Sequence, residues 1–229
     1  MPLDAGPGDG PPTRSAVTAI AGLAGLLLVI IGGILIGGPA HGAPLAPDAG
    51  WARLMTSSRS APGIAVAMAL AVIGGTVVTS VGAALVAVVL FVRRRRRTAI
   101  SLVATVIVAS IASPIIKSAV QRPRPTGGLM HLTSFSYPSG HATIAATLAV
   151  VLVLALPRVW TWILGSAWAA VIAWSRTYLG VHWLSDVAAG VVLGASLALL
   201  VHSSFALVTA SRAVSGGRRT ASGEARRSA

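Results

Sequence analysis

Long apolar stretches separated by short polar ones run through most of the chain. A helix needs about 20 consecutive apolar residues to cross the hydrocarbon core of a bilayer, and stretches near that length recur along this sequence. Their approximate limits are residues 16–38, 63–92, 98–116, 138–156, 159–175 and 184–209. The pattern therefore predicts an all-α, polytopic membrane helix bundle with six transmembrane helices.

The two ends of the chain lack this pattern. Residues 1–15, rich in Gly, Pro and Asp, are expected to form a disordered leader, and residues 210–229 a basic, disordered cytoplasmic tail. Residues 16–209 then form one transmembrane domain. The first apolar stretch is longer than a signal-peptide core, although the small residues around Ala40 and Gly42 would suit a cleavage site. A retained first span is the favoured interpretation.

Composition supports a membrane protein and narrows its chemistry. Of 229 residues, 55% are hydrophobic, 10% are charged and none is cysteine, which excludes disulfides, thiolate nucleophiles and cysteine metal sites. The net charge of +13 does not indicate a nucleic-acid partner, because the arginines concentrate at residues 93–97 and in the tail. The positive-inside rule places both groups, together with Arg158, in the cytoplasm. Six spans then put both termini there as well.

This topology brings three polar segments to the extracytoplasmic side: the end of the third span, the start of the fourth and the junction of the fifth and sixth. Two ionisable residues mark that rim, Lys117 and Asp186. Lys117 is the one lysine of the chain, and Asp186 is the one acidic residue between Asp48 and Glu224. Each could be an interfacial anchor that reaches water, but ionisable groups at a membrane are more often functional.

The first polar segment carries Lys117 and, seven residues later, Arg124 followed by Pro125. Alone, these two cations would be read as loop charge. Arg122 lies between them and could add to the same field, but a solvated charge at the rim is the favoured interpretation.

The second polar segment reads Pro138, Ser139, Gly140, His141 and precedes an apolar stretch. A turn residue, a possible N-cap hydroxyl and a glycine at a helix start leave backbone N–H groups free, and the helix dipole there favours an anion. His141 would then lie at the mouth of an anion site.

The third polar segment contains Ser175 and Arg176, then His182, then Asp186. Residues four apart share a helix face, so Asp186 can accept a hydrogen bond from one nitrogen of His182 and leave the other nitrogen free to attack. Gly190 and Gly194 continue that face and would allow close helix packing.

Together the three segments resemble the motifs of the type 2 phosphatidic acid phosphatase (PAP2) superfamily, which includes lipid phosphate phosphatases, bacterial undecaprenyl-diphosphate phosphatases and vanadium haloperoxidases. The resemblance implies a PAP2/haloperoxidase-like fold, in which His182 attacks phosphorus, Asp186 orients it and His141 protonates the leaving group. It also implies a set of phosphate-binding positions: Lys117, Arg124, Ser139, Gly140 and Arg176, with the backbone acting at Ser139 and Gly140.

The expected function is that of a membrane phosphatase acting on a lipid phosphate or diphosphate, with undecaprenyl diphosphate favoured because the bacterial enzymes are compact and extracytoplasmic. Phosphatidic acid and phosphatidylglycerophosphate fit the same residues. Transfer of the phosphate to another acceptor stays open, and a non-catalytic transporter or assembly factor is a third class. No cofactor is expected, and one carboxylate is too few for a two-metal site, so the reaction should be metal-independent. Oligomeric state stays open.

Overall fold

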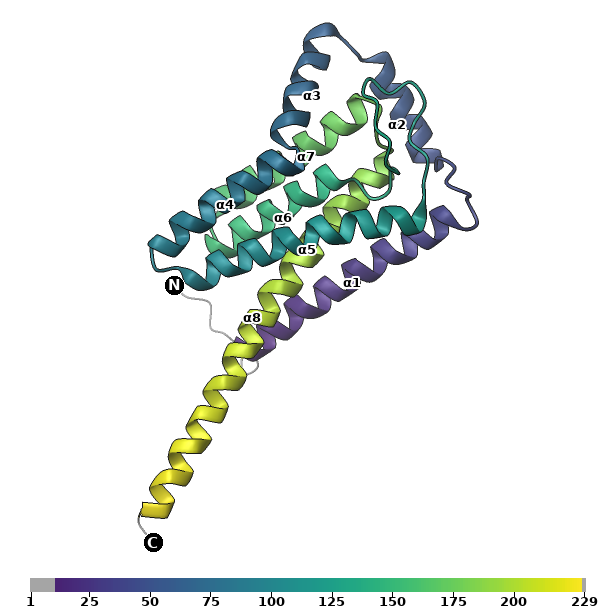
Figure 1. Ribbon diagram of the computed structural model, residues 1–229. Coiled ribbons are helices and arrows are strands. Elements are labelled where there is room, and N and C mark those ends of the chain that lie inside the picture. Colours follow the sequence, from purple (N-terminus) through teal and green to yellow (C-terminus); the bar gives the residue numbers. More distant parts are fainter. Residues whose placement is uncertain (1–10, 228–229) are drawn as a thin grey trace.

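Eight helices make up the part of the chain that the computed structural model describes, which is the backbone of residues 11–227 and the side chains of residues 15–207. They are α1 (Pro11–Gly37), α2 (Ala46–Ser57), α3 (Ala61–Ile73), α4 (Thr76–Val92), α5 (Arg96–Val120), α6 (Gly140–Ala155), α7 (Val159–Tyr178) and α8 (Leu184–Arg227). These residues include no strand, which confirms the all-α class. Helix α8 packs against α1, α5 and α6, and α7 covers the other side of α6 (Figure 1).

The packing of α6 on α8 depends on small residues. A Cβ atom at Gly190 would lie 2.6 Å from the carbonyl oxygen of Ser139 and 3.0 Å from Cβ of Ala142, and one at Gly194 would collide with the carbonyl of Thr143. The prediction that Gly190 and Gly194 form a close-packing face is therefore confirmed. Because the two helices approach so closely, the start of α6 lies beside the start of α8.

The six-span prediction is not confirmed. By length and composition, three helices of the described residues can cross a membrane, at Ser15–Gly37, Arg96–Val120 and Leu184–Leu207, or four if the bent pair α2–α3 counts as one. The apolar helices α4 and α6 have 17 and 16 residues, which is about 25 Å at 1.5 Å per residue, shorter than a hydrocarbon core of about 30 Å.

One predicted span is interrupted. The stretch 63–92 was expected to be a single helix, but α3 ends at Ile73 and α4 begins at Thr76. Gly74 and Gly75 separate them, and two adjacent glycines weaken a helix because they have the most backbone freedom to lose.

Helices α2 and α3 meet at a bend of 120°. The Tyr178 hydroxyl connects their turn to α7, because it accepts a hydrogen bond from the N–H of Ser60 and donates one to the carbonyl of Ser58.

The ends of the chain also differ from expectation. Helix α8 continues to Arg227, through most of the segment 210–229 that was predicted to be disordered. Extending an existing helix costs far less than starting one, so a polar segment joined to a membrane helix can stay helical. Helix α1 begins at Pro11, inside the predicted leader, and residues 1–10 lie outside the described part.

The polar segments converge as predicted. The end of α5, the start of α6, the end of α7 and the start of α8 meet at one end of the bundle, beside α2 and α3 (Figure 1). The arginine-rich turn between α4 and α5 lies at the opposite end of those helices.

Candidate active site

His182 and Asp186 lie together in the turn that leads into α8. Nδ1 of His182 is 3.5 Å from Oδ2 of Asp186 and has no shorter polar contact among the described residues. Oδ2 also accepts the backbone N–H of Trp183 at 2.8 Å. The two side chains lie together as predicted, but at 3.5 Å the predicted hydrogen bond is not made. Helix α8 begins at Leu184, so His182 precedes the helix and the contact is made by the turn and not along a helix face.

The imidazole of His182 is held neutral with a defined tautomer. Its exposed fraction is 5%, and burial lowers its pKa from 6.5 to about 3 although the Asp186 carboxylate opposes that change. Since a carboxylate can only accept, the proton belongs on Nδ1. The Nε2 lone pair then faces Nη1 of Arg124, 3.3 Å away, and this nitrogen is the one able to attack an electrophile.

Arg124 uses all five of its N–H donors. Nε donates to the carbonyl of Ser134 at 2.7 Å, Nη2 to the Ser134 hydroxyl at 3.0 Å and the Phe135 carbonyl at 3.1 Å, and Nη1 to the Val181 carbonyl at 2.6 Å and to His182. The guanidinium therefore joins the loop before α6 to the turn before α8. The donor aimed at Nε2 is the one that a phosphoryl group on that nitrogen would receive.

Lys117 holds the same loop from α5. Its Nζ donates to the carbonyls of Phe135 and Ser136 at 2.8 and 3.1 Å. The ammonium interacts electrostatically with Arg124, Asp186 and Arg176. Two of its three donors are engaged, so one is left for an anion.

Arg176 is the cation of the site with the fewest hydrogen-bond partners among the described residues. Its exposed fraction is 1%, its Nε has no hydrogen-bond partner among the described residues, and its Nη1 lies 3.8 Å from Sδ of Met130. A buried charge without an anionic partner is costly in free energy. The site is thus built to receive negative charge at Arg176.

The start of α6 corrects one expectation. The backbone N–H of Ser139 donates to the carbonyl of Asp186 at 2.9 Å, so it is not available to a phosphate as the resemblance implied. Ser139 is the N-cap, but its hydroxyl makes no cap bond and is buried with no hydrogen-bond partner among the described residues. The hydroxyl of Ser139, and the N–H of Gly140 in the first turn of α6, are the groups that can meet an oxyanion.

His141 faces α3. Its Nε2 lies 3.0 Å from the carbonyl oxygen of Ala71, and since a carbonyl only accepts, Nε2 carries a proton. The side chain interacts electrostatically with Arg176, Lys117 and Arg124, which places it at the same site. To act as an acid, His141 needs a second proton on Nδ1, because a neutral imidazole that gave up its one N–H would become an imidazolate.

Two buried charged residues beside the site were not predicted from the sequence. Arg122, expected to be a solvated rim charge, is fully buried and lies 2.7 Å from Asp48 on one side and 2.7 Å from Asp186 on the other. Asp48 was given no role, yet its exposed fraction is 1%. Arg122 can be buried because two carboxylates neutralise its charge. These partners lie 74 and 64 residues away in the sequence, so no local pattern reveals the pairing.

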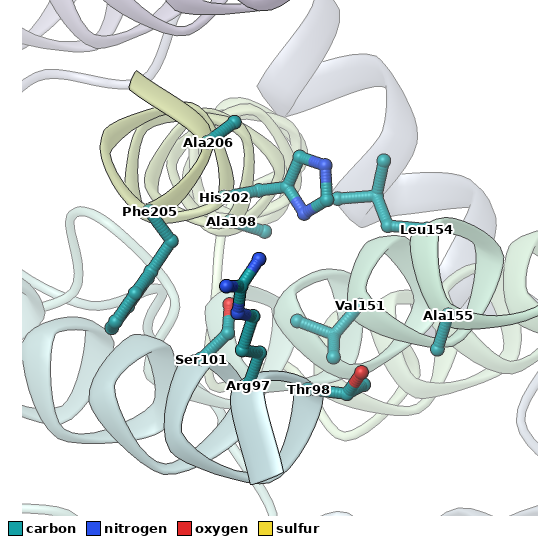
Figure 2. Close-up of a pocket in the computed structure, with 10 residues that line it drawn as sticks. All are labelled: Arg97, Thr98, Ser101, Val151, Leu154, Ala155, Ala198, His202, Phe205 and Ala206. Atoms are coloured by element: carbon teal, nitrogen blue, oxygen red, sulfur yellow. The ribbon is translucent and has the colours of Figure 1, made fainter. Parts of the chain in front are cut away.

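The bundle has one cavity at the predicted site and others elsewhere. A small one of about 30 Å³ touches His182, Asp48, Thr177 and Trp183. A larger one of about 260 Å³ lies at the start of α5 and the end of α6, beside the middle of α8, where Arg97 and His202 face it (Figure 2). It contains none of the predicted site residues. An apolar groove of about 460 Å³ runs from Ile73, near the site, to Arg95.

The described residues contain no cluster of three or more His, Cys, Asp or Glu side chains that could hold a metal ion. Side chains of the types gathered at this site can attack as an imidazole nucleophile, transfer protons and stabilise an oxyanion.

Comparisons with known proteins relate this chain to one family. Residues 98–209 match the model of the PAP2 superfamily. The chain is 38% identical to an undecaprenyl-diphosphatase of Sulfolobus acidocaldarius over 50% of its own length and 58% of that relative, and 36% identical to a decaprenylphosphoryl-5-phosphoribose phosphatase of Mycobacterium tuberculosis over 56% and 67%. The first alignment thus spans less than two thirds of the relative.

The fold resembles a solved one. A transmembrane PAP2-type phosphatidylglycerolphosphate phosphatase from Bacillus subtilis superposes with a TM-score of 0.63 at 25% identity, covering 79% of this chain and 94% of that one.

Proposed function

This chain belongs to the PAP2 superfamily, and we propose that it hydrolyses a lipid phosphate or diphosphate, undecaprenyl diphosphate first among them, through a phosphohistidine on His182. The observation that carries the proposal is the buried guanidinium of Arg176, which has no acidic partner at a site where a neutral imidazole presents a lone pair. Phosphoryl transfer spreads negative charge over three equatorial oxygens, and fixed cations stabilise that charge.

In the first step, Nε2 of His182 attacks phosphorus and the bond to the leaving oxygen breaks, with its electron pair going to that oxygen. His141 enters this step as the imidazolium, donates one of its two protons to the leaving oxygen and becomes neutral. Asp186 stabilises the positive charge that forms on the imidazole. Lys117, Arg124, Arg176, the Ser139 hydroxyl and the Gly140 N–H bind the phosphoryl oxygens.

In the second step, water attacks the same phosphorus, gives its proton to His141, and the P–N bond breaks. Orthophosphate leaves and His182 returns to its neutral form. Both steps call on side chains of the chain itself, and the proposed reaction is metal-independent. A sugar hydroxyl in place of water would make the same site a phosphotransferase.

Undecaprenyl diphosphate is favoured because the two sequence relatives described above are named for polyprenyl substrates. Phosphatidylglycerophosphate is the second candidate, supported by the name of the similar solved structure, and phosphatidic acid fits the same chemistry. The apolar groove that begins at Ile73 offers a surface for the hydrocarbon chain of any of them.

We also propose that α1, α4, α5, α6, α7 and α8 all cross the membrane, with the site on the extracytoplasmic side and both termini in the cytoplasm. The five arginines at residues 93–97 and Arg158 support this orientation, because they lie at the end of the bundle away from the site and positive charge favours the cytoplasm.

The test is phosphate release by the purified protein in detergent with EDTA, comparing the three lipids. His182→Ala should abolish release and Asp186→Asn should lower it steeply, on the order of 10⁴-fold by analogy with a lost triad orienter. Chelator-resistant release that both variants lose supports the mechanism and names the substrate. Near-normal release by His182→Ala would reject the phosphohistidine, and loss of release with EDTA would reject metal independence.

A further inference from the structure

A buried ion-pair chain connects α2 to the catalytic carboxylate. Asp48 Oδ2 lies 2.7 Å from Nη2 of Arg122, and Nη1 of Arg122 lies 2.7 Å from Oδ1 of Asp186. Asp186 in turn faces His182. Exposed fractions are 1% for Asp48 and 0% for both Arg122 and Asp186, so water screens none of these interactions.

The same ion-pair chain also holds Trp183 and Ser185, which lie between His182 and Asp186 in the sequence. Asp48 accepts the backbone N–H and the hydroxyl of Ser185, both at 2.8 Å. Arg122 donates to the same hydroxyl at 2.7 Å, and its guanidinium carbon lies 5.6 Å from the centre of the Trp183 ring. The turn that carries His182 is therefore fixed from outside by groups on α2 and on the loop after α5.

The arrangement is more than a way to anchor α2. A buried ion pair seldom adds stability over well-packed apolar side chains, and here one guanidinium serves two carboxylates. The three groups together carry one net negative charge beside an imidazole that must become positive during catalysis. Asp48 lies outside residues 98–209, which match the family model, so this charge comes from a part of the chain that the match does not cover.

We propose that Asp48 and Arg122 are positioning residues that set the orientation of Asp186 and the charge felt by His182, and thereby its nucleophilicity. This inference rests on the proposed function, because it assigns His182 as the nucleophile. Asp48 and Arg122 act through Asp186, because Arg122 contacts both carboxylates and neither residue forms a hydrogen bond with His182 in the described part of the chain.

The charges predict that two substitutions change the basicity of His182 in opposite directions. Asp48→Asn leaves Arg122 to pair with Asp186 alone, so the net charge of the three groups becomes zero. The imidazolium of His182 is then less stable and kcat falls. The fall should be roughly 10- to 100-fold, by analogy with the loss of a residue that orients a metal ligand. Arg122→Gln leaves two negative carboxylates, so His182 takes up a proton at higher pH and the acid limb of the kcat/KM profile moves up by about one pH unit or more.

The double variant decides between charge and structure. Asp48→Asn with Arg122→Gln restores one net negative charge, so the acid limb should return toward that of the wild type. A merely structural role predicts the reverse, since the second substitution would add damage. Other charged or titratable groups facing His182 or Asp186 stay unchanged in all variants: Lys117, Arg124 and Tyr137.

The experiment measures pH profiles of kcat and kcat/KM on undecaprenyl diphosphate in detergent, with Arg53→Gln, an exposed arginine on α2, as the control that keeps the wild-type profile. An acid limb raised in Arg122→Gln and lowered again in the double variant supports the proposal. Limbs that coincide with the wild type in all variants overturn it. If Arg122→Gln does not fold, Asp48→Asn decides: a lower kcat at unchanged KM supports the proposal, and an unchanged kcat overturns it.

Failure of the proposed function is recognised separately. If the wild type releases phosphate from none of the three lipids, the proposed function has failed, and NMR of ¹⁵N-labelled histidine reads the proton uptake of His182 in the same variants without substrate. The rise in Arg122→Gln and its reversal in the double variant are expected there too, and their absence overturns the inference.

Discussion

The cationic side chains at the site differ in what their hydrogen bonds leave available. Arg124 donates every N–H to the protein, and Lys117 donates two of three. Arg122 is neutralised by two carboxylates. Arg176 makes one weak contact, to a thioether. Arg176 is therefore the group from which a bound phosphoryl group gains most.

Arg176→Gln should lower kcat by about 10²- to 10³-fold, the loss seen when one oxyanion donor is removed. Phosphate release from the preferred lipid at saturating concentration measures it. Arg53→Gln, exposed on α2, should keep the wild-type rate. An unchanged rate in Arg176→Gln would remove this residue from the site.

The pH dependence of stability should also reflect His182. Burial lowers its pKa to about 3 from 6.5, so between these values the unfolded chain binds a proton that the folded protein does not. Stability from this group is therefore complete above about pH 6.5 and lost as the pH falls toward 3. Between about pH 4 and pH 7, the melting temperature in detergent should change more steeply with pH for the wild type than for His182→Ala. Equal slopes would contradict a neutral, buried His182.

At the scale of elements, the site depends on how closely α6 approaches α8. Gly190 and Gly194 lie against the backbone of Ser139 and Thr143, and this contact brings the first turn of α6 to the turn that carries His182. The hydrogen bond from the Ser139 N–H to the Asp186 carbonyl crosses the same interface. A change in helix separation should therefore affect stability and catalysis together.

Gly194→Ala tests this packing. The added methyl would collide with the Thr143 carbonyl, and overpacking of this kind destabilises by about 1–3 kcal/mol. We expect a lower melting temperature in detergent together with a lower kcat. Gly82→Ala on α4 is the matched control, because nothing lies within 4 Å of its added methyl, and its melting temperature should stay the same or rise slightly. A wild-type melting temperature in Gly194→Ala would count against the close contact.

At the scale of the whole molecule, the helices separate two ends of different character. One end gathers the predicted catalytic residues under α2 and α3; the other carries the arginines at residues 93–97 and the cavity lined by Arg97 and His202 (Figures 1 and 2). Charge at the second end favours the cytoplasm. A phosphate that leaves the site would then be released outside the cell membrane.

The absence of cysteine from the chain allows a direct test of sidedness. Cysteine replaces His131 in the loop between α5 and α6, or Arg93 at the end of α4, and both positions are exposed. A membrane-impermeant maleimide on intact cells should label His131→Cys at once and Arg93→Cys only after permeabilisation. The reverse pattern would place the site in the cytoplasm.

The amino-acid sequence alone was sufficient to predict the helical class, the convergence of three polar segments, the pairing of His182 with Asp186 and the small-residue face at Gly190 and Gly194. These features follow from hydropathy and from spacings of a few residues, which act locally and can be read along the chain. The two adjacent glycines at Gly74 and Gly75 also indicate a helix break, but the hydropathy pattern continues across them, so a single span was predicted.

Only the tertiary structure decided the partners of the charges. Whether Arg122 is a solvated rim charge or a buried link between Asp48 and Asp186 depends on contacts 74 and 64 residues apart in sequence, and no local pattern encodes such a separation. The same holds for Arg124, whose donors are all engaged, and for Arg176, whose Nε has no partner among the described residues. The physical reason is that burial and pairing, which fix what a charge can do, arise only when distant segments pack together.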